Sequence, residues 1–307
     1  MPRLDPLAAD PLAADPTAPP DPDQLRAALA GIRALLLDLD GVIVLKGRLI
    51  PGAADALAVL EARSIPYRIV TNSSLVSRSS LSRWSAKVGA PIPPDRIMSA
   101  LSASAAYTRH RRPGGSLYVL ATADALTEFD GQRLMTPAEA DDPDAVAAAV
   151  VIGDAPETVT FDNLNRAFRL VRGGAELIGM HRNRWWLTPA GPTLDSGAFV
   201  AGLEFATGHP ARVLGKPSPD FFREAAAQLA TELRGRGERR LLRAEIAMVG
   251  DDVRSDVLAA QRVGIRGVFV QTGKHTLTDV AAAAGGRAGG RPSAIAASLA
   301  EVVAALR

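Results

Sequence analysis

Four short segments of this chain combine aspartate, lysine and small polar residues, and each follows a predicted buried strand. In chain order they are Asp38-Leu39-Asp40-Gly41, Thr71-Asn72-Ser73, Gly215-Lys216-Pro217 and Gly250-Asp251-Asp252, with Asp256 one helical turn further on. Ligands of an open parallel sheet bind at the carboxyl ends of its strands. We therefore expect these segments to converge on one site.

Several carboxylates in one place repel each other unless a cation neutralises them. Mg²⁺ suits an all-oxygen site, because it keeps several waters and takes few protein ligands. Asp38 and Asp251 would supply carboxylates to it, and Asp40 its main-chain carbonyl. With the metal and Lys216 nearby, a phosphate can approach an anionic nucleophile. Attack by Asp38 would give an aspartyl phosphate, which water then hydrolyses.

The other polar residues have roles in the same reaction. Asp40 could protonate the leaving oxygen and then remove a proton from water. Phosphate oxygens need hydrogen-bond donors, which supply much of the catalysis in phosphoryl transfer. The expected donors are Thr71, Asn72, Ser73 and the backbone N–H groups from Leu39 to Gly41. Asp252 and Asp256 would orient Lys216 or a metal-bound water.

Each motif alone has another interpretation. Asp-Leu-Asp-Gly also suits a turn after a strand, and Gly-Asp-Asp a helix N-cap. A calcium loop would need further acidic ligands, and a phosphate-binding P-loop would need Ser or Thr where Pro217 stands. The four motifs in this order, each ending a strand, favour the phosphate site.

Composition narrows the class of protein. The chain has 307 residues, a net charge of +2 and no cysteine. Thiolate chemistry and disulfides are therefore excluded, and so small a charge excess does not indicate a nucleic-acid surface. No apolar run reaches the length of a membrane span, and the N-terminus lacks the pattern of a secretory signal. We expect a cytoplasmic protein that binds neither nucleic acid nor membrane.

Strands and helices alternate along the chain, which predicts an α/β fold with a Rossmann-like parallel sheet. Residues 1–23, rich in Asp and Pro, are expected to be a disordered tail. Residues 24–112 and 197–307 are expected to form the core, which begins with a helix at 24–32. An inserted α/β unit at 113–196, with strands at 117–120, 149–152, 176–179 and 185–188, is expected to interrupt it. The core strands are expected at 34–38, 67–71, 97–98, 211–214, 245–250 and 267–270. A flexible loop at 281–292 and a closing helix at 293–306 would follow.

The motifs, taken together, resemble those of the haloacid-dehalogenase (HAD) superfamily. VTNSS, LGKPSPDFFREA and MVGDDVRSDVLAAQRVGIRGVFVQTGKH resemble the NagD-like branch, subfamily IIA, over about residues 33–275. Within it, the likeness is greatest to the group of phospholysine phosphohistidine inorganic pyrophosphate phosphatase. The resemblance implies a HAD-like core with an α/β cap of the C2 type, Mg²⁺ dependence, a small phosphorylated substrate and homodimerisation through the cap.

Two consequences of the resemblance concern specificity. His181 and Asn183 follow a cap strand where NagD-like proteins present their specificity loop, so we expect them to face the leaving group. Members of the most similar group often have Ser at the position of Asp40, so its presence here favours phosphomonoesters. Hydrolysis of pyrophosphate or phosphoramidates (phosphohistidine, phospholysine) is the alternative, followed by a non-hydrolytic binding protein of the same fold. The sequence does not identify the substrate.

Overall fold

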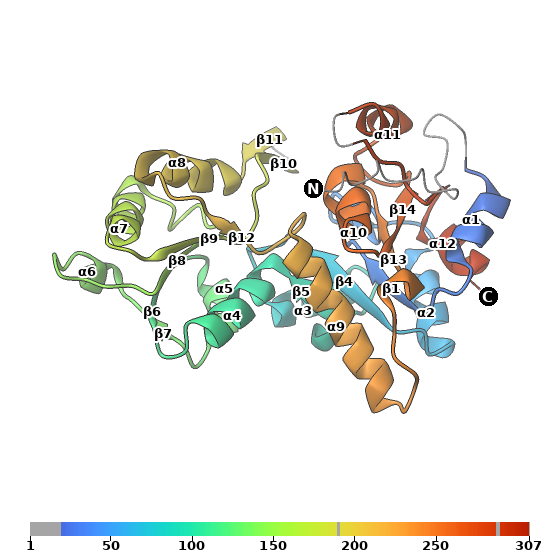
Figure 1. Ribbon diagram of the computed structural model, residues 1–307, viewed down its shortest axis with the longest axis horizontal. Coiled ribbons are helices and arrows are strands. Elements are labelled where there is room, and N and C mark those ends of the chain that lie inside the picture. Colours follow the sequence, from blue (N-terminus) through green and yellow to red (C-terminus); the bar gives the residue numbers. More distant parts are fainter. Residues whose placement is uncertain (1–19, 189–190, 287–288, 307) are drawn as a thin grey trace, which may run out of the picture. The chain divides into compact units, whose positions relative to one another are not determined.

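Two units of α/β structure make up the described chain, residues 20–188, 191–286 and 289–306 of this computed structural model (Figure 1). Of the described residues, the first unit contains 20–70, Val88–Pro91 and those from Phe222 onward. The second unit contains Thr71–Lys87 and Ile92–Phe221. The α/β class predicted from the sequence is confirmed. The predicted domain bounds, 24–112 with 197–307 and 113–196, stay a prediction.

Parallel strands form the centre of the first unit. They lie in the order β15–β14–β13–β1–β4, so β1 is flanked by strands from both ends of the chain. Their bounds are β1 (Ala34–Leu37), β4 (Tyr67–Thr71), β13 (Ile246–Gly250), β14 (Arg266–Val270) and β15 (Ala294–Ala296). All four residues of β1 and all five of β13 are buried, as expected for parallel strands covered on both faces.

Helices and a short hairpin complete the first unit. They are α1 (Pro22–Leu29), hairpin β2 (Val44–Leu45) and β3 (Arg48–Leu49), α2 (Ala53–Ala62), α9 (Pro219–Gly235), a π-helical turn (Val253–Leu258), α10 (Ala259–Gln261), α11 (Leu277–Ala284) and α12 (Leu299–Ala305). Phe269 and Ile295 of the sheet pack against Val257 of the π-helical turn and Val280 of α11. This packing fixes the π-helical turn against the sheet at the end of β13.

A second parallel sheet, in the order β12–β9–β8–β6–β7, forms the centre of the second unit. Its strands are β6 (Ser116–Leu120), β7 (Arg133–Leu134), β8 (Ala149–Ile152), β9 (Glu176–Gly179) and β12 (Arg212–Val213). The second unit also contains α3 (Arg78–Lys87), β5 (Ile97–Ser99), α4 (Ala100–Arg111), α5 (Ala123–Leu126), α6 (Pro137–Ala140), α7 (Phe161–Arg172), hairpin β10 (Trp185–Thr188) and β11 (Gly191–Leu194), and α8 (Gly197–Thr207).

Alternate residues of β8 face different helices, because successive side chains of a strand point to opposite faces. Val150 and Ile152 pack in one cluster with α7 and α8. Ala149 and Val151 pack in another cluster with α4 and α5. The second sheet is therefore also covered on both faces, as the helices in Figure 1 show.

Two predicted strands are paired differently from the expectation. The strand before Lys216 was expected in the core sheet, but β12 pairs with β9 of the second sheet. Because β12 has only two residues, its length and composition carry no signal of its partner. The strand at 185–188 forms, but it pairs with β11 as an antiparallel hairpin outside the five-stranded sheet.

Element bounds at the two ends of the chain also differ. The first helix begins at Pro22 and not at residue 24, because Asp21 caps it by accepting from the N–H groups of Asp23 and Gln24. Residues 1–19 of the predicted tail lie outside the described residues. Residues 281–284 belong to α11 and not to a loop. The predicted closing helix is split into β15 and α12, and β15 pairs with β14.

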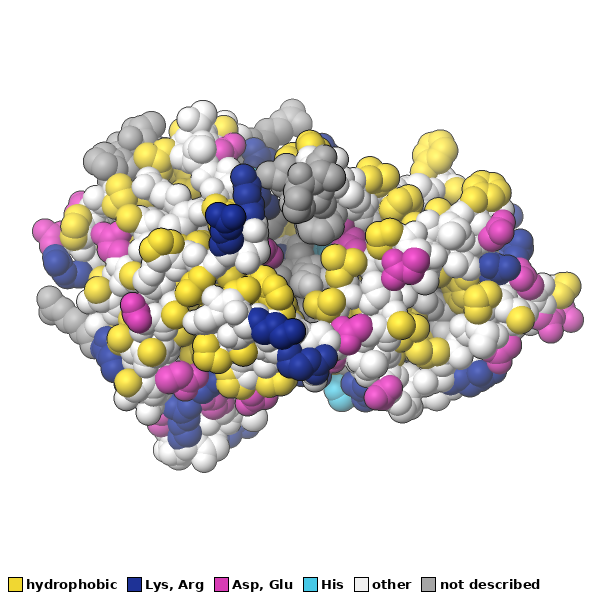
Figure 2. All heavy atoms as spheres, turned by 180° about the vertical axis from the view of Figure 1, so that it is seen from behind, with side chains coloured by type: hydrophobic (Ala, Val, Ile, Leu, Met, Phe, Trp, Pro, Cys, Tyr) yellow, Lys and Arg dark blue, Asp and Glu magenta, His cyan; other side chains and the backbone are white. Residues whose placement is uncertain are grey.

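The surface charge and the helices of the described residues can be compared with the expectations from composition. On the face drawn in Figure 2, basic and acidic side chains are both scattered among apolar and neutral ones. None of the helices in the described ranges combines the length and the apolar character that crossing a bilayer requires.

Candidate active site

Three buried carboxylates meet at the carboxyl ends of β1 and β13. Asp38 follows β1, Asp251 follows β13 and Asp256 lies on the π-helical turn after it. Each offers a carboxylate oxygen, and these oxygens all lie within 4.8 Å of one another. The exposed fractions of the three residues are 7%, 3% and 0%. This is the convergence that the sequence predicts for Asp38 and Asp251, with Asp256 added to the pair.

Strand register explains the convergence. β1 and β13 are parallel neighbours, with Leu37 opposite Val249. The N–H of Asp38 extends the ladder by donating to the carbonyl of Val249 at 2.9 Å. The residues that follow the two strands are therefore held at the same edge of the sheet. Asp256 is oriented from its own loop, because its Oδ2 accepts from the N–H of Asp252 at 3.2 Å.

Three glycines leave room for these carboxylates. A β-carbon on Gly250 would lie 2.4 Å from the Cβ of Asp256, and one on Gly273 would lie 2.0 Å from Oδ2 of Asp251. A β-carbon on Gly41 would lie 2.4 Å from the Cγ of Asp251. Any side chain at these positions would displace an aspartate. The backbone at these three glycines therefore packs directly against the side chains of Asp251 and Asp256.

A loop after β14 completes the site and was not singled out from the sequence. The N–H of Lys274 donates to Oδ2 of Asp251 at 2.7 Å, and its Nζ lies 3.0 Å from Oδ2 of Asp252. The hydroxyl of Thr272 donates to the carbonyl of Gly41 at 2.5 Å. Burial alone would raise the pKa of Asp252, but the Lys274 ammonium and the N–H of Ser255 lower it to about 2. In the sequence, Gly273 was the residue that could have indicated a close approach of this loop to another segment.

This set of donors fits a hard divalent cation. Three clustered, buried carboxylates are an all-oxygen set, and oxygen ligands are those that such ions take. Without a cation their mutual repulsion would oppose ionisation.

The predicted partners near Asp38 lie in the same loop. Asp40 is exposed and forms a bridge with Val44. The N–H of Leu39 donates to Oδ1 of Asp38 at 2.7 Å, and that of Gly41 donates to the carbonyl of Val44 at 2.6 Å. These two N–H groups, expected to bind phosphate, therefore have partners within the chain, and their binding role stays a prediction.

Asn72 is bound to Lys216 in the second unit. Its Oδ1 accepts from the N–H of Lys216 at 2.8 Å, and its Nδ2 donates to the carbonyl of Lys216 at 2.9 Å. Thr71 accepts from the N–H of Ser73 at 3.1 Å through its Oγ1. Thr71 and Lys216 are buried. Two of the predicted motifs thus contact each other directly.

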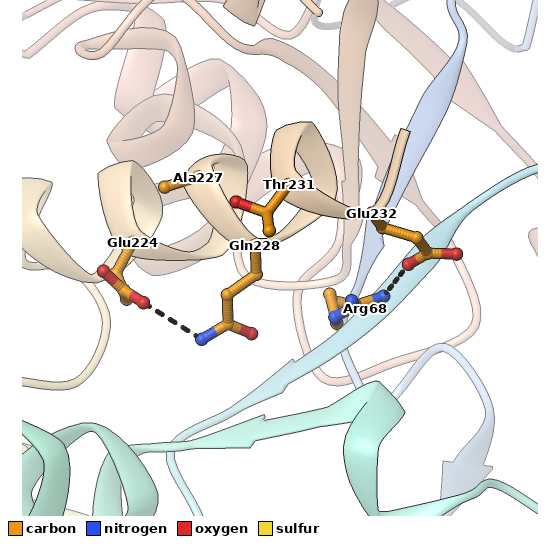
Figure 3. Close-up of a pocket in the computed structure, with 6 residues that line it drawn as sticks. All are labelled: Arg68, Glu224, Ala227, Gln228, Thr231 and Glu232. Carbon is orange, nitrogen blue, oxygen red and sulfur yellow. Dashed lines mark hydrogen bonds and ion pairs between the residues drawn. The ribbon is translucent and has the colours of Figure 1, made fainter. Parts of the chain in front are cut away.

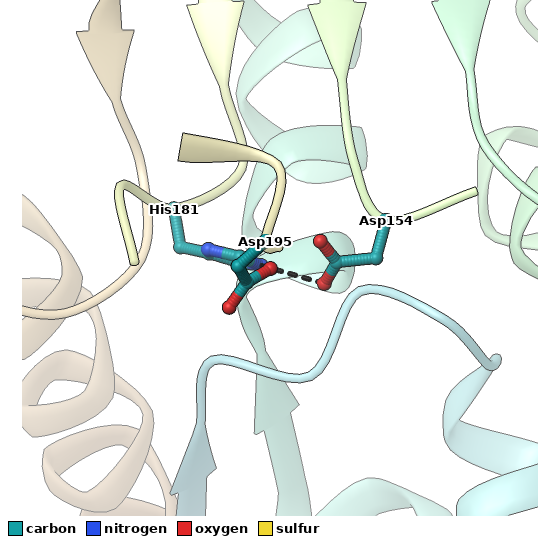
Figure 4. Close-up of side chains that lie close together, drawn as sticks. All are labelled: Asp154, His181 and Asp195. Carbon is teal, nitrogen blue, oxygen red and sulfur yellow. Dashed lines mark hydrogen bonds and ion pairs between the residues drawn. The ribbon is translucent and has the colours of Figure 1, made fainter. Parts of the chain in front are cut away.

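His181 is buried between two aspartates that the sequence analysis did not identify, Asp154 and Asp195 (Figure 4). The Nε2 of His181 lies 2.7 Å from Oδ2 of Asp154 and 3.7 Å from Oδ1 of Asp195. Hydrogen bonds among these residues and to Ser74 and Ser196 account for the cluster without a cation. The expectation that His181 and Asn183 face a leaving group stays a prediction.

A cavity of ≈ 370 Å³ in the first unit contains none of the predicted site residues (Figure 3). It lies along α9, and its charged lining residues are Arg68, Glu224 and Glu232. Arg68 is paired with Glu232 at 2.6 Å, so the lining keeps an excess of acidic charge. Such a cavity does not suit an anionic phosphate.

Comparison with known proteins agrees with this geometry. Residues 35–134 match the haloacid dehalogenase-like hydrolase family, and residues 213–302 match a HAD-hydrolase-like family. The mouse haloacid dehalogenase-like hydrolase domain-containing protein 2 is 37% identical over 255 residues, which cover 82% of this chain and 89% of that protein. Human phospholysine phosphohistidine inorganic pyrophosphate phosphatase is 31% identical, with 82% and 87% covered.

Solved structures give the same answer. The 4-nitrophenylphosphatase from Thermotoga maritima superposes with a TM-score of 0.77 and 25% identity, covering 91% of this chain and 99% of that one. NagD from Escherichia coli superposes with a TM-score of 0.74 and 25% identity, covering 88% and 98%. The fold and the carboxylate site define a hydrolase of the HAD type.

The chain belongs to the haloacid dehalogenase-like hydrolase family. It is a phosphatase of that family, and the resemblance to the NagD-like branch predicted from its motifs is confirmed.

Proposed function

We propose that this protein is a Mg²⁺-dependent phosphatase that hydrolyses a small phosphorylated metabolite through an aspartyl phosphate on Asp38. One observation carries the proposal: the carboxylates of Asp38, Asp251 and Asp256 are clustered at the carboxyl ends of adjacent parallel strands. When bound there, Mg²⁺ would neutralise negative charge on the phosphate and the carboxylates. Asp38, Asp251 and Asp256 would hold it, and the main-chain carbonyl of Asp40 is a further proposed ligand.

The reaction has two steps on the protein's own residues. The carboxylate of Asp38 forms a bond to phosphorus while the bond from phosphorus to the leaving oxygen breaks, and Asp40 gives its proton to that oxygen. Asp40 then removes a proton from water, the water oxygen attacks phosphorus, and inorganic phosphate leaves Asp38. Asp40 is exposed, so it can exchange protons with solvent.

Thr71, Asn72, Ser73 and Lys216 are proposed to bind the phosphate oxygens. Motif order supports this assignment. The ring of hydrogen bonds between Asn72 and the main chain of Lys216 also supports it, because it fixes one potential donor next to another. Donors held in place before the reaction stabilise developing charge without reorganisation.

The substrate class is proposed to be a phosphomonoester, and pyrophosphate or a phosphoramidate is the second candidate. A 31% identical relative named for phospholysine, phosphohistidine and pyrophosphate supports the second candidate. Asp40 supports the first, because an ester leaving group needs a proton. Phosphate release from a panel of metabolite monoesters, pyrophosphate and phosphohistidine separates the two.

Hydrolysis of p-nitrophenyl phosphate with Mg²⁺ or with EDTA tests the proposed activity. We expect turnover that depends on Mg²⁺ and that Asp38→Asn abolishes while the variant stays folded. Asp55→Asn is the matched control, because Asp55 is exposed on α2. Turnover unaffected by EDTA, or retained by Asp38→Asn, would overturn the proposal. We further propose a cytoplasmic location and a homodimer, the latter measurable by light scattering.

A further inference from the structure

The buried cluster of Asp154, His181 and Asp195 has no part in the proposed reaction, yet it binds the segments around Asn72 and Lys216. Asp154 follows β8, His181 follows β9 and Asp195 precedes α8, and Figure 4 shows the three side chains converging from these separate segments. His181 is only 1% exposed. Polar groups buried in this way are retained at a free-energy cost unless they are paired.

Asp154 fixes the loop that carries Asn72. Its Oδ2 accepts from the hydroxyl of Ser74 at 2.6 Å, and its own N–H donates to the same hydroxyl at 2.9 Å. Its Oδ1 accepts from the N–H of Ser196 at 3.1 Å, at the start of α8. Ser74 lies two residues after Asn72. One carboxylate therefore ties that loop to the second sheet and to α8.

His181 makes a second connection to Asn72. Its Nδ1 accepts from the N–H of Asn183 at 3.3 Å, so the other ring nitrogen carries the proton that is donated to Asp154. The Oδ1 of Asn183 in turn accepts from Nδ2 of Asn72 at 3.4 Å. A continuous chain of contacts thus runs from Asp154 through His181, Asn183 and Asn72 to Lys216.

Close packing limits movement of the segments that these contacts connect. A β-carbon on Gly215 would lie 2.6 Å from Oδ1 of Asn72 and 2.7 Å from the carbonyl of Met180, which precedes His181. A β-carbon on Gly197 would lie 2.2 Å from the carbonyl of Asn183. The segments before Lys216 and after His181 are therefore in direct backbone contact with their neighbours.

Burial alone would raise the pKa of Asp154, but the hydrogen bonds from His181, Asp195 and Ser74 lower it below its usual range. Asp154 is thus an ionised acceptor with four donors, these three side chains and the N–H of Ser196. Hydrogen bonds to an ionised group are about twice as strong as neutral ones.

We propose that Asp154 and His181 are positioning residues that hold Asn72, and through it Lys216, in place for the phosphate, and that neither contacts the substrate. This inference rests on the proposed function. It differs from the expectation that His181 faces the leaving group, because both ring nitrogens are engaged inside the second unit. A ring with no exposed edge has no polar atom to offer a leaving group.

Two variants test the proposal, Asp154→Asn and Asn183→Ala, with Asp124→Asn as the control. Asp124 is another partly buried carboxylate that accepts from serines, but these are Ser77 and Ser80, at the start of α3. We expect kcat to fall about tenfold or more in both test variants, because small displacements of positioned groups have effects of this size. The factor should be the same for p-nitrophenyl phosphate and for an alkyl phosphate.

A substrate contact would instead change KM by amounts that differ between the two leaving groups. Losses of kcat that differ between the leaving groups would overturn the proposal. A fall in kcat of the same size in Asp124→Asn would do so too.

A second readout does not need activity. The chain contains four lysines, so protein labelled with ¹⁵N-lysine gives few amide signals, and Lys216→Arg identifies the one from Lys216. The N–H of Lys216 donates directly to Asn72. We expect this signal to shift more than those of the other lysines in Asp154→Asn and Asn183→Ala, and to stay in place in Asp124→Asn. An unmoved signal contradicts the positioning role even if wild-type turnover is absent, whereas absent turnover with a shifted signal contradicts only the proposed function.

Discussion

Gly41 lies so close to Asp251 that a β-carbon on Gly41 would be 2.4 Å from the carboxyl carbon of that aspartate. The loop that follows Asp38 is thereby fitted against the loop that follows β13. The hydroxyl of Thr272 holds the same glycine through its carbonyl. The candidate metal ligands are thus arranged by contacts between segments more than 200 residues apart along the chain.

Replacement of Gly41 by alanine should remove Mg²⁺-dependent turnover, because the new methyl group would displace Asp251. Gly47→Ala is a matched control. Both glycines have positive φ, +85° and +74°, but no atom lies within 4 Å of a β-carbon on Gly47. The backbone cost, about 1–2 kcal/mol for a left-handed residue, is therefore common to both variants.

Turnover and chemical denaturation measure the two effects separately. We expect Gly47→Ala to keep wild-type turnover and to lose only this backbone cost in unfolding free energy. Gly41→Ala should lose more stability than Gly47→Ala and nearly all activity. Equal activity in the two variants would show that the contact between Gly41 and Asp251 has no role in the site.

Removal of the Asp256 carboxylate should weaken the metal site. We expect Asp256→Asn to raise the Mg²⁺ concentration for half-maximal turnover by about tenfold or more, a usual effect of changing a ligand or its immediate support. Mg²⁺ should also raise the melting temperature of the wild type more than that of the variant. Asp279→Asn, on the exposed start of α11, serves as the control, and a Mg²⁺ response equal to that of wild type in Asp256→Asn would contradict the assignment.

Strand identity and the position of the carboxylates could be predicted from the sequence. Fully apolar runs such as Ala34–Leu37 can only be buried, and Asp38 must then stand at the end of the strand. The parallel order of the strands follows from the alternation with helices. These are local properties, so the sequence can indicate them without knowledge of the tertiary contacts.

Other features depend on contacts between distant residues, which leave no local pattern. The pairing of β12 with β9 is one, because two residues are too few to show a preference. The contact of Lys274 with Asp251 is another, since it is made by a backbone N–H that every residue except proline has. Asp154 and Asp195 stand alone in their segments, and only the fold brings them to His181.

Asp40 should be required in both steps if it is the acid and base. We expect Asp40→Asn to lower kcat by about 10²–10⁴, the usual contribution of a positioned proton donor or acceptor. The loss should be larger for an alkyl phosphate than for p-nitrophenyl phosphate, because nitrophenolate leaves without a proton. Steady-state kinetics on both substrates measure this, and Asp23→Asn, an exposed residue of α1, is the control. Full activity in Asp40→Asn would remove Asp40 from the mechanism.

Asp195 should make the protein less stable as the pH rises. Burial, and then its hydrogen bond with Asp154, raise the pKa of Asp195 to about 7 in the folded protein, whereas the ordinary value is 3.8. Between about pH 4 and 7 the folded chain keeps a proton that the unfolded chain has lost. The unfolding free energy that this residue contributes therefore falls as the pH rises through that window, and it levels off above it.

Asp195→Asn cannot titrate and keeps an oxygen for the N–H of Ser196, which Asp195 Oδ1 accepts at 2.8 Å. The melting temperature of this variant, relative to wild type, should therefore increase from pH 5 to pH 7 and stay constant above pH 7. Asp154→Asn should have a lower melting temperature than wild type at pH 7. The pKa of Asp154 is lowered in the folded protein, so its ionised form stabilises the folded state and the variant lacks it. Melting curves at pH 5, 6, 7 and 8 measure both. A constant difference between Asp195→Asn and wild type across this range would show that Asp195 is already ionised at pH 5, and it would contradict the raised pKa of Asp195.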